Sequence, residues 1–168
     1  MASPSDLYVG GDAVYILDGG NNRIIVTDPG FHNARAIDNL QLDGNAYQMK
    51  EPEGIFVTPE NDIYVADTGN SQIIVLNDEG SILRVYQKPE SSMFVGASSF
   101  VPVSMVVDRM GTIYVACKGN PNGAAMLSQA GEFLGYFGIN KTPVNFQVVM
   151  ERLWRSLLSD KQKEGVAK

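Results

Sequence analysis

One segment of the chain occurs three times, and this repetition constrains the fold more than any other feature. A tyrosine inside a short apolar run stands at Tyr15, Tyr64 and Tyr114, at intervals of 49 and 50 residues. The turn that follows keeps these intervals, with its glycine and asparagine at Gly20 and Asn21, Gly69 and Asn70, and Gly119 and Asn120. A repeat of this length predicts one supersecondary unit per repeat, with neighbouring units stacked around a shared core.

Residues 52–87 show what one unit contains. Its apolar runs, at residues 55–57, 63–66, 73–76 and 82–87, are separated by short stretches rich in Asn, Asp, Glu, Gly and Pro. Strand-forming residues broken at such short intervals predict consecutive antiparallel hairpins, and therefore a four-stranded meander. Such a sheet cannot bury both of its faces alone. Four strands per repeat at this period predict a β-propeller.

The second unit resembles the NHL repeat. The resemblance is carried by Pro-Glu-Gly-Ile at 52–55, Ile-Tyr-Val-Ala-Asp-Thr-Gly-Asn at 63–70 and Gln-Ile-Ile-Val at 72–75. The first unit is similar, whereas the third departs from the pattern because Cys117 and Lys118 replace Asp-Thr. The resemblance covers about residues 4–138 and implies propeller blades. It leaves the function open, because NHL propellers serve as ligand-, protein- and RNA-binding scaffolds and as lyase scaffolds.

We therefore predict an all-β protein with three four-stranded blades of an NHL-type propeller, half of a six-bladed ring, and a C-terminal amphipathic helix. The blades are expected at about residues 4–38, 52–87 and 101–138 within a propeller region of residues 1–138, and the links between them as polar loops. Residues 139–168 break the pattern. Apolar residues near helical spacing predict a helix at about residues 143–158, followed by a charged tail.

The composition narrows the classes of partner. The net charge is −6, and no cluster of Lys and Arg precedes the C-terminal tail. Because phosphate backbones are bound through many cationic contacts, we expect no nucleic-acid partner. The sequence holds no apolar run long enough to cross a bilayer and no recognisable targeting segment, so no direct membrane span is expected. Cys117 is the one cysteine, which excludes an internal disulfide.

The chain has few side chains for catalysis, and we assign no catalytic and no metal-binding residue. His32, the one histidine, falls in a predicted outer turn without the spacing of a metal site. The resemblance implies two kinds of propeller enzyme: the zinc type needs several histidines and is excluded, whereas a Ca²⁺ held by oxygen ligands stays open. Asp6, Glu53, Asn70 and Asn120 are expected near strand ends at the mouth of the channel, and we predict them as ligand-binding residues.

Asp18 and Asp67 follow the second strand of their units at matching positions. We predict that their carboxylates accept backbone N–H groups and hold the Gly-Asn turn. Cys117 takes this position in the third unit, where we expect a buried, inert thiol.

Three hypotheses of function follow. The first is a non-enzymatic binding module for a protein, peptide or glycan, because the catalytic set is missing and propellers offer loop-lined channel mouths. The alternative is a calcium-dependent lactonase or hydrolase, which rests on the family resemblance, Glu53 and the asparagines. The third is that the chain is part of a larger bacterial surface protein, which favours a cell-surface or extracellular location. Three blades do not close a ring, so the exposed blade faces predict a homodimer that completes six blades.

Overall fold

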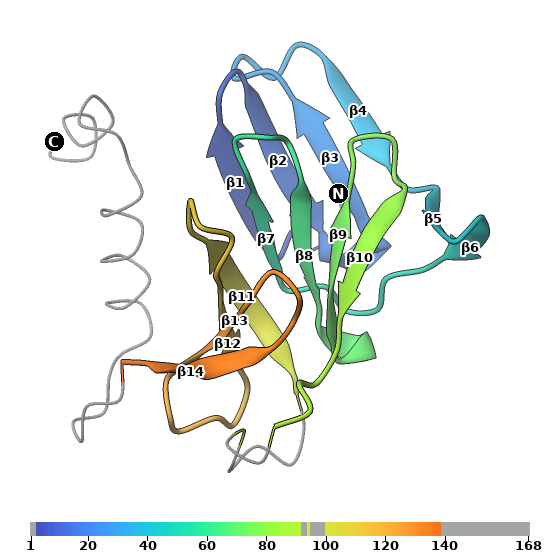
Figure 1. Ribbon diagram of the computed structural model, residues 1–168. Coiled ribbons are helices and arrows are strands. Elements are labelled where there is room, and N and C mark those ends of the chain that lie inside the picture. The colour runs from blue at the N-terminus through green and yellow to red at the C-terminus, as the bar shows by residue number, and fades with distance from the viewer. Residues whose placement is uncertain (1–2, 92–93, 95–99, 139–168) are drawn as a thin grey trace, which may run out of the picture.

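The structure is a computed structural model that describes residues 3–91, 94 and 100–138. These residues form three four-stranded antiparallel sheets and one two-stranded hairpin (Figure 1). Each of the three sheets is a meander, with its strands in the order of the chain. The predicted all-β fold with three propeller blades is therefore confirmed. The helix predicted at residues 143–158 and the charged tail lie outside the described residues.

The blades follow one another along the chain. Blade 1 consists of β1 (Asp6–Gly10), β2 (Ala13–Asp18), β3 (Arg23–Thr27) and β4 (Ala34–Ile37). Blade 2 consists of β7 (Gly54–Val57), β8 (Ile63–Asp67), β9 (Gln72–Leu76) and β10 (Ile82–Tyr86). Blade 3 consists of β11 (Pro102–Val107), β12 (Ile113–Cys117), β13 (Ala124–Leu127) and β14 (Phe133–Phe137). The first strands β1, β7 and β11 lie side by side and form the inner edge of the arc (Figure 1).

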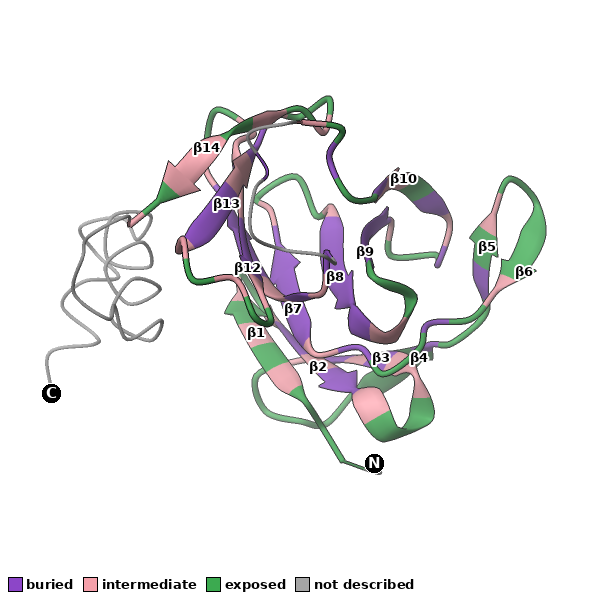
Figure 2. Cartoon of the chain, turned by 90° about the horizontal axis from the view of Figure 1, so that it is seen from below, coloured by how far each residue is buried: buried purple, intermediate pink, exposed green. Residues whose placement is uncertain are grey.

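Each pair of neighbouring blades encloses an apolar core of its own. Successive residues of a strand point to opposite faces of its sheet. On β8, Ile63 and Val65 therefore join the core with blade 1, whereas Tyr64 and Ala66 join the core with blade 3. All residues of β8 and β9 are buried as a result, and Figure 2 shows blade 2 as the most buried sheet. This explains why these two strands have continuous apolar runs, as strands buried on both faces do.

The link between blades 1 and 2 differs from the expected polar loop. It forms a hairpin of β5 (Leu40–Leu42) and β6 (Asn45–Tyr47), joined by Asp43 and Gly44. Both turn residues have positive φ, 49° and 76°, which a two-residue type I′ turn requires and which Asp-Gly supplies. Leu40 is buried against the core between blades 1 and 2. The hairpin places Tyr47 beside the turn that follows β8.

The turns between the third and fourth strands have a shared construction. A short polar side chain at the start of each turn accepts backbone N–H groups from the residues that follow it. These side chains are Asp28, Asn77 and Ser128. This local hydrogen bonding favours the turn over continued strand. His32 lies in the first of these turns and is exposed, as expected.

Candidate functional site: a groove at the inner-strand turns

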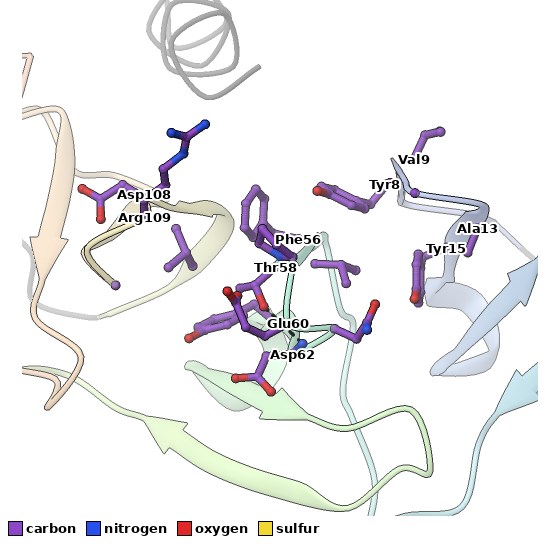
Figure 3. A pocket seen from close by; sticks show the side chains of 18 of the residues that line it. Tyr8, Val9, Ala13, Tyr15, Phe56, Thr58, Glu60, Asp62, Asp108 and Arg109 are labelled. Atoms are coloured by element: carbon purple, nitrogen blue, oxygen red, sulfur yellow. Dashed lines mark hydrogen bonds between the residues drawn. The ribbon is translucent and has the colours of Figure 1, made fainter. Parts of the chain in front are cut away.

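A hollow of the described structure lies where the first strands of all three blades end. The turns β1–β2, β7–β8 and β11–β12 converge on a groove of about 1140 Å³ (Figure 3). Each blade supplies the end of its innermost strand and the turn that leads to its second strand. Three segments far apart in the sequence therefore build one site, as propellers do at the mouth of their channel.

Aromatic side chains at equivalent positions form the floor of the groove. Tyr8 of β1 and Phe56 of β7 pack edge to face, with ring centroids 5.3 Å apart. Tyr15 of β2 lies 6.4 Å from Tyr8, again in an edge arrangement. Burial raises the pKa of Tyr8, with a smaller contribution from Tyr15, and burial followed by the neighbouring Tyr86 raises the pKa of Tyr64 to about 12. Both phenols are neutral at physiological pH. Tyr8 is half-buried and offers ring surface to a ligand, whereas Tyr64 is buried in the core between blades 2 and 3.

The rim of the groove carries an excess of negative charge. Its ionisable side chains other than tyrosine are four carboxylates and one guanidinium, namely Asp12, Glu60, Asp62, Asp108 and Arg109. Asp12, Glu60 and Arg109 are exposed, and Figure 3 shows Glu60 and Arg109 among the side chains that line the groove. Like charges that line one concave site concentrate their potential and attract cations.

Two of the rim carboxylates are held by the protein itself. Asp108 Oδ1 accepts backbone N–H groups from Met110 and Thr112, both at 2.9 Å, and its Oδ2 accepts the Tyr114 hydroxyl at 3.2 Å. Asp62 Oδ2 lies 3.9 Å from Arg84 Nη2. These contacts fix the position of the two carboxylates. The partners described for Asp108 are neutral N–H and hydroxyl groups, so they leave its charge uncompensated.

Two residues predicted for the channel mouth, Asp6 and Glu53, lie at the other end of the first strands. Asp6 begins β1, and its Oδ2 accepts the backbone N–H of Ile55 in blade 2 at 2.9 Å. Burial raises the pKa of Asp6, and its hydrogen bonds from Ile55 and Leu7 oppose this. Glu53 precedes β7 and forms an ion pair with Lys118 of blade 3. Both carboxylates connect neighbouring blades.

The two predicted asparagines belong to the turns between second and third strands. Asn70 Nδ2 donates to Asp67 Oδ2 at 2.8 Å and to the carbonyl of Gln48 at 3.2 Å. Asn120 Oδ1 accepts the backbone N–H of Asn122 at 3.0 Å. The structure thus gives Asp6, Glu53, Asn70 and Asn120 partners within the protein and does not gather them in the groove.

The turn aspartates are structural, although their partners differ from the prediction. Neither Asp18 nor Asp67 makes a side-chain cap bond to the 3₁₀ turn that follows it, at η1 (Gly19–Asn21) and η2 (Thr68–Asn70). Each instead accepts the side-chain amide of the turn asparagine, Asn21 or Asn70. Asp67 also accepts a backbone N–H, but from Lys50 in the link before blade 2 at 2.7 Å and not from the turn itself. The tight turn brings the asparagine amide against the carboxylate in place of its own N–H groups. Cys117 in blade 3 is half-buried, and burial raises its pKa to about 12, as expected of an inert thiol.

The groove itself was not found from the sequence. One signal was available: the turns after the first strands differ in all three units, with Gly-Gly-Asp, Thr-Pro-Glu-Asn-Asp and Asp-Arg-Met-Gly, whereas the Gly-Asn turns repeat. Loops that vary on a repeated scaffold are where binding surfaces are built. The repeated polar residues mark the turns that stabilise the fold instead.

Two further properties concern metals and membranes. Among the described residues, no group of three or more His, Cys, Asp or Glu side chains lies close enough together to hold a metal ion. Within the same part of the chain, no helix has the length and apolar character needed to span a membrane.

Comparison with known proteins places the second blade in a family. Residues 49–76 match the family model of the NHL repeat. These residues are an NHL repeat. The resemblance noted in the sequence is confirmed for this blade, and the NHL match covers β7, β8 and β9. No curated protein matches the chain.

Solved structures extend the comparison from this NHL repeat to all three blades. A catalytically inactive virginiamycin B lyase from Staphylococcus aureus, solved with quinupristin, is 16% identical, with a TM-score of 0.56 over 85% of this chain and 44% of the lyase. A streptogramin B lyase is 17% identical, with a TM-score of 0.57 over 82% of this chain and 41% of that protein. A protein named "putative gluconolactonase" gives 17% identity, a TM-score of 0.54, and coverage of 79% and 47%.

These similarities show the propeller fold alone, because the identities are low. The chain spans less than half the length of each of these three proteins.

Proposed function

We propose that this chain is a non-enzymatic binding module that takes a protein or peptide segment in the groove at the inner-strand turns. The observation that carries the proposal is the convergence of three blade turns on one hollow with an aromatic floor and an exposed polar rim. Apolar sites with a few convergent polar groups are typical of ligand-binding sites on rigid scaffolds. The carboxylates of Asp6 and Glu53, which could serve chemistry, are engaged between blades.

The charge and the rings of the groove favour basic side chains in the ligand. The rim has four carboxylates against one guanidinium. Lysine or arginine side chains can pair with exposed Asp12 and Glu60, and their aliphatic stems and charges fit the ring of half-buried Tyr8. We therefore expect peptides with alternating basic and apolar residues to bind in preference to acidic peptides and neutral glycans.

Titration calorimetry with three probes tests this function: a Lys- and Leu-containing peptide, a Glu- and Leu-containing peptide of the same length, and a neutral oligosaccharide. We expect binding of the basic peptide, weakened by salt because exposed charges are screened. Tyr8→Ala is expected to weaken it about tenfold as an aromatic anchor, and Glu60→Gln by about twofold to fivefold. Glu79→Gln removes an exposed carboxylate from the β9–β10 turn and serves as the matched control. If Tyr8→Ala leaves peptide binding unchanged, the groove is not the binding site. If the protein prefers the oligosaccharide, its ligand is a glycan and not a peptide.

A calcium-dependent lactonase or hydrolase is the second candidate. It is supported by the similarity in fold to the protein named as a gluconolactonase. Calcium takes six to eight oxygen ligands, so the proposed donors Asp6, Glu53, Asn70 and Asn120 would have to exchange their present hydrogen bonds for the ion. Titration with Ca²⁺ and a lactone-hydrolysis assay decide the matter, because saturable Ca²⁺ binding with lactone turnover would establish an enzyme.

We further propose that the chain acts at the cell surface as part of a larger bacterial protein. The chain covers only 41–47% of the three propellers of similar fold, which agrees with a larger protein around these blades. Fractionation of the source cells with an antibody against the propeller region is expected to give the signal in the envelope or medium and to report the mass of the natural chain. A cytosolic chain would contradict the location.

A further inference from the structure

Blade 1 has an exposed face that is buried at the same positions in blade 2. Ile55 and Val57 on β7 are 5% and 3% exposed because blade 1 covers them. Their equivalents on β1, Leu7 and Val9, are 60% and 59% exposed. The row of side chains continues across the sheet, since Leu7 pairs with Ile16 of β2 and Ile16 with Ile25 of β3. Figure 2 shows the difference between exposed β1 and buried β7.

Blade 3 exposes the other face of its sheet, which corresponds to the face of blade 2 that packs on blade 3. Tyr64 and Val75 of blade 2 point toward blade 3 and are buried there. Their equivalents in blade 3, Tyr114 and Met126, are paired in register and only half-buried. Phe137 of β14 lies on the same face, is 39% exposed, and packs edge to face on Tyr114 at 5.6 Å.

The two exposed faces are complementary, because in a propeller one of these faces packs on the other wherever two blades meet. Blade 2 is covered by blade 1 on one face and by blade 3 on the other. Among the described residues, no further blade covers the outer face of blade 1 or the outer face of blade 3. A face like that of blade 3 is therefore suited to cover a face like that of blade 1. Exposed apolar surfaces of this kind mark interaction sites.

We propose that a second copy of this chain covers both faces, so that two copies close a six-bladed ring. Blade 3 of each copy packs on blade 1 of the other, and a twofold axis makes the two junctions equivalent. The described residues form three blades, so two copies supply six, which lies within the four to eight blades that close a propeller. In the closed ring the groove becomes one half of a channel mouth, and each copy contributes the same aromatic floor and acidic rim. The inference does not depend on which ligand the groove binds.

Light scattering coupled to size exclusion, with the full chain at about ten micromolar, tests this assembly. The chain mass is 18.3 kDa, and we expect a species of twice that mass. Leu7→Asp on blade 1 and Phe137→Asp on blade 3 are each expected to give the monomer, because either variant damages both junctions. Leu83→Asp alters a leucine of β10 in blade 2 that is 49% exposed but lies on neither terminal blade, and it is expected to remain dimeric.

Circular dichroism of each variant distinguishes loss of the interface from loss of the fold. A folded monomer of Leu7→Asp or Phe137→Asp supports the proposal, and a folded dimer of both variants overturns it. A wild-type monomer would overturn it and would assign the two faces to further blades of a longer polypeptide. An open series of higher oligomers would overturn it as well, since it would mean that the junctions form without closing the ring.

Discussion

The turn that follows β8 in blade 2 and the turn that follows β12 in blade 3 occupy equivalent places, but they are held very differently. In blade 2, fully buried Asp67 accepts the Lys50 N–H at 2.7 Å, the Asn70 amide at 2.8 Å and the Tyr47 hydroxyl. In blade 3 the carboxylate is replaced by Cys117. The Nδ2 of Asn120 is then buried with no hydrogen-bond partner among the described residues.

The difference shows what one carboxylate does for an NHL blade. The asparagine of the turn is kept in all three units, but it needs an acceptor one turn earlier in the chain. Blade 2 supplies that acceptor and adds the hydroxyl of Tyr47 from the β5–β6 hairpin. Blade 3 has lost the acceptor and leaves a buried amide unsatisfied, which costs stability. We infer that the central blade is held together most strongly and the third blade less so.

The largest expected effect is that of removing the blade 2 carboxylate. Asp67→Ala removes the buried acceptor shared by the Tyr47 hydroxyl, the Lys50 N–H and the Asn70 amide, and we expect it to lower the free energy of unfolding by roughly 4 kcal/mol. Urea denaturation measures this. Asp78→Ala removes an exposed carboxylate of the β9–β10 turn and should change stability by less than about 0.5 kcal/mol. Equal effects of the two variants would contradict the comparison.

The glycines of the two turns give the next largest contrast. A Cβ on Gly69 would lie 2.7 Å from the Lys50 carbonyl oxygen, so we expect Gly69→Ala to cost roughly 3 kcal/mol. Gly119 has open space around it but a φ of +70°, and Gly119→Ala should cost only about 1 kcal/mol of backbone strain. Thermal melts and urea denaturation of both variants give the ranking. The reverse order would mean that the blade 2 turn is less closely packed against Lys50 than described.

A smaller contrast is expected from the asparagines. Asn70→Ala removes the amide bonds to Asp67 and Gln48 and should cost about 1.5 kcal/mol. Asn120→Ala loses the bond from the Asn122 N–H but also removes the unsatisfied amide, so we expect a cost of at most about 0.5 kcal/mol. Urea denaturation of both variants under the same conditions tests this contrast. A larger loss of stability for Asn120→Ala would show that the Asn120 amide has an acceptor.

The smallest effect is a dependence on alkaline pH. Burial, followed by the hydrogen bond and charge of Asp67, raises the pKa of Tyr47 from 10.0 to about 12. The folded state therefore holds the phenol proton more tightly than the unfolded state does. This contribution to stability is complete below pH 10 and is lost as the pH rises toward 12.

Phenolate absorbance and urea denaturation across this pH range provide the measurement. Tyr47→Phe should remove one late-titrating phenol and flatten the decline, while the share of Tyr64, whose pKa is also about 12, remains. An unchanged titration curve in Tyr47→Phe would place the Tyr47 hydroxyl away from Asp67.

The sequence by itself determined the unit of this fold. The interval between Tyr15, Tyr64 and Tyr114 and the breaks between apolar runs specify four-stranded meanders, because strand alternation and turn chemistry are local. The same local chemistry identified the NHL repeat in blade 2 and a structural role for Asp18 and Asp67. The Asp-Gly turn of the β5–β6 hairpin was also readable, but its three-residue strands are too short to show a period of two.

Only the tertiary structure decided which of these residues meet. Glu53 pairs with Lys118 and Tyr47 with Asp67 across 65 and 20 positions, and no local rule sets such partners. The groove depends in the same way on the ends of β1, β7 and β11 being brought to one place by the packing of blades. The repeat specifies the strands and turns of each blade, whereas the contacts between blades decide which of its polar side chains bond within the protein and which line the groove.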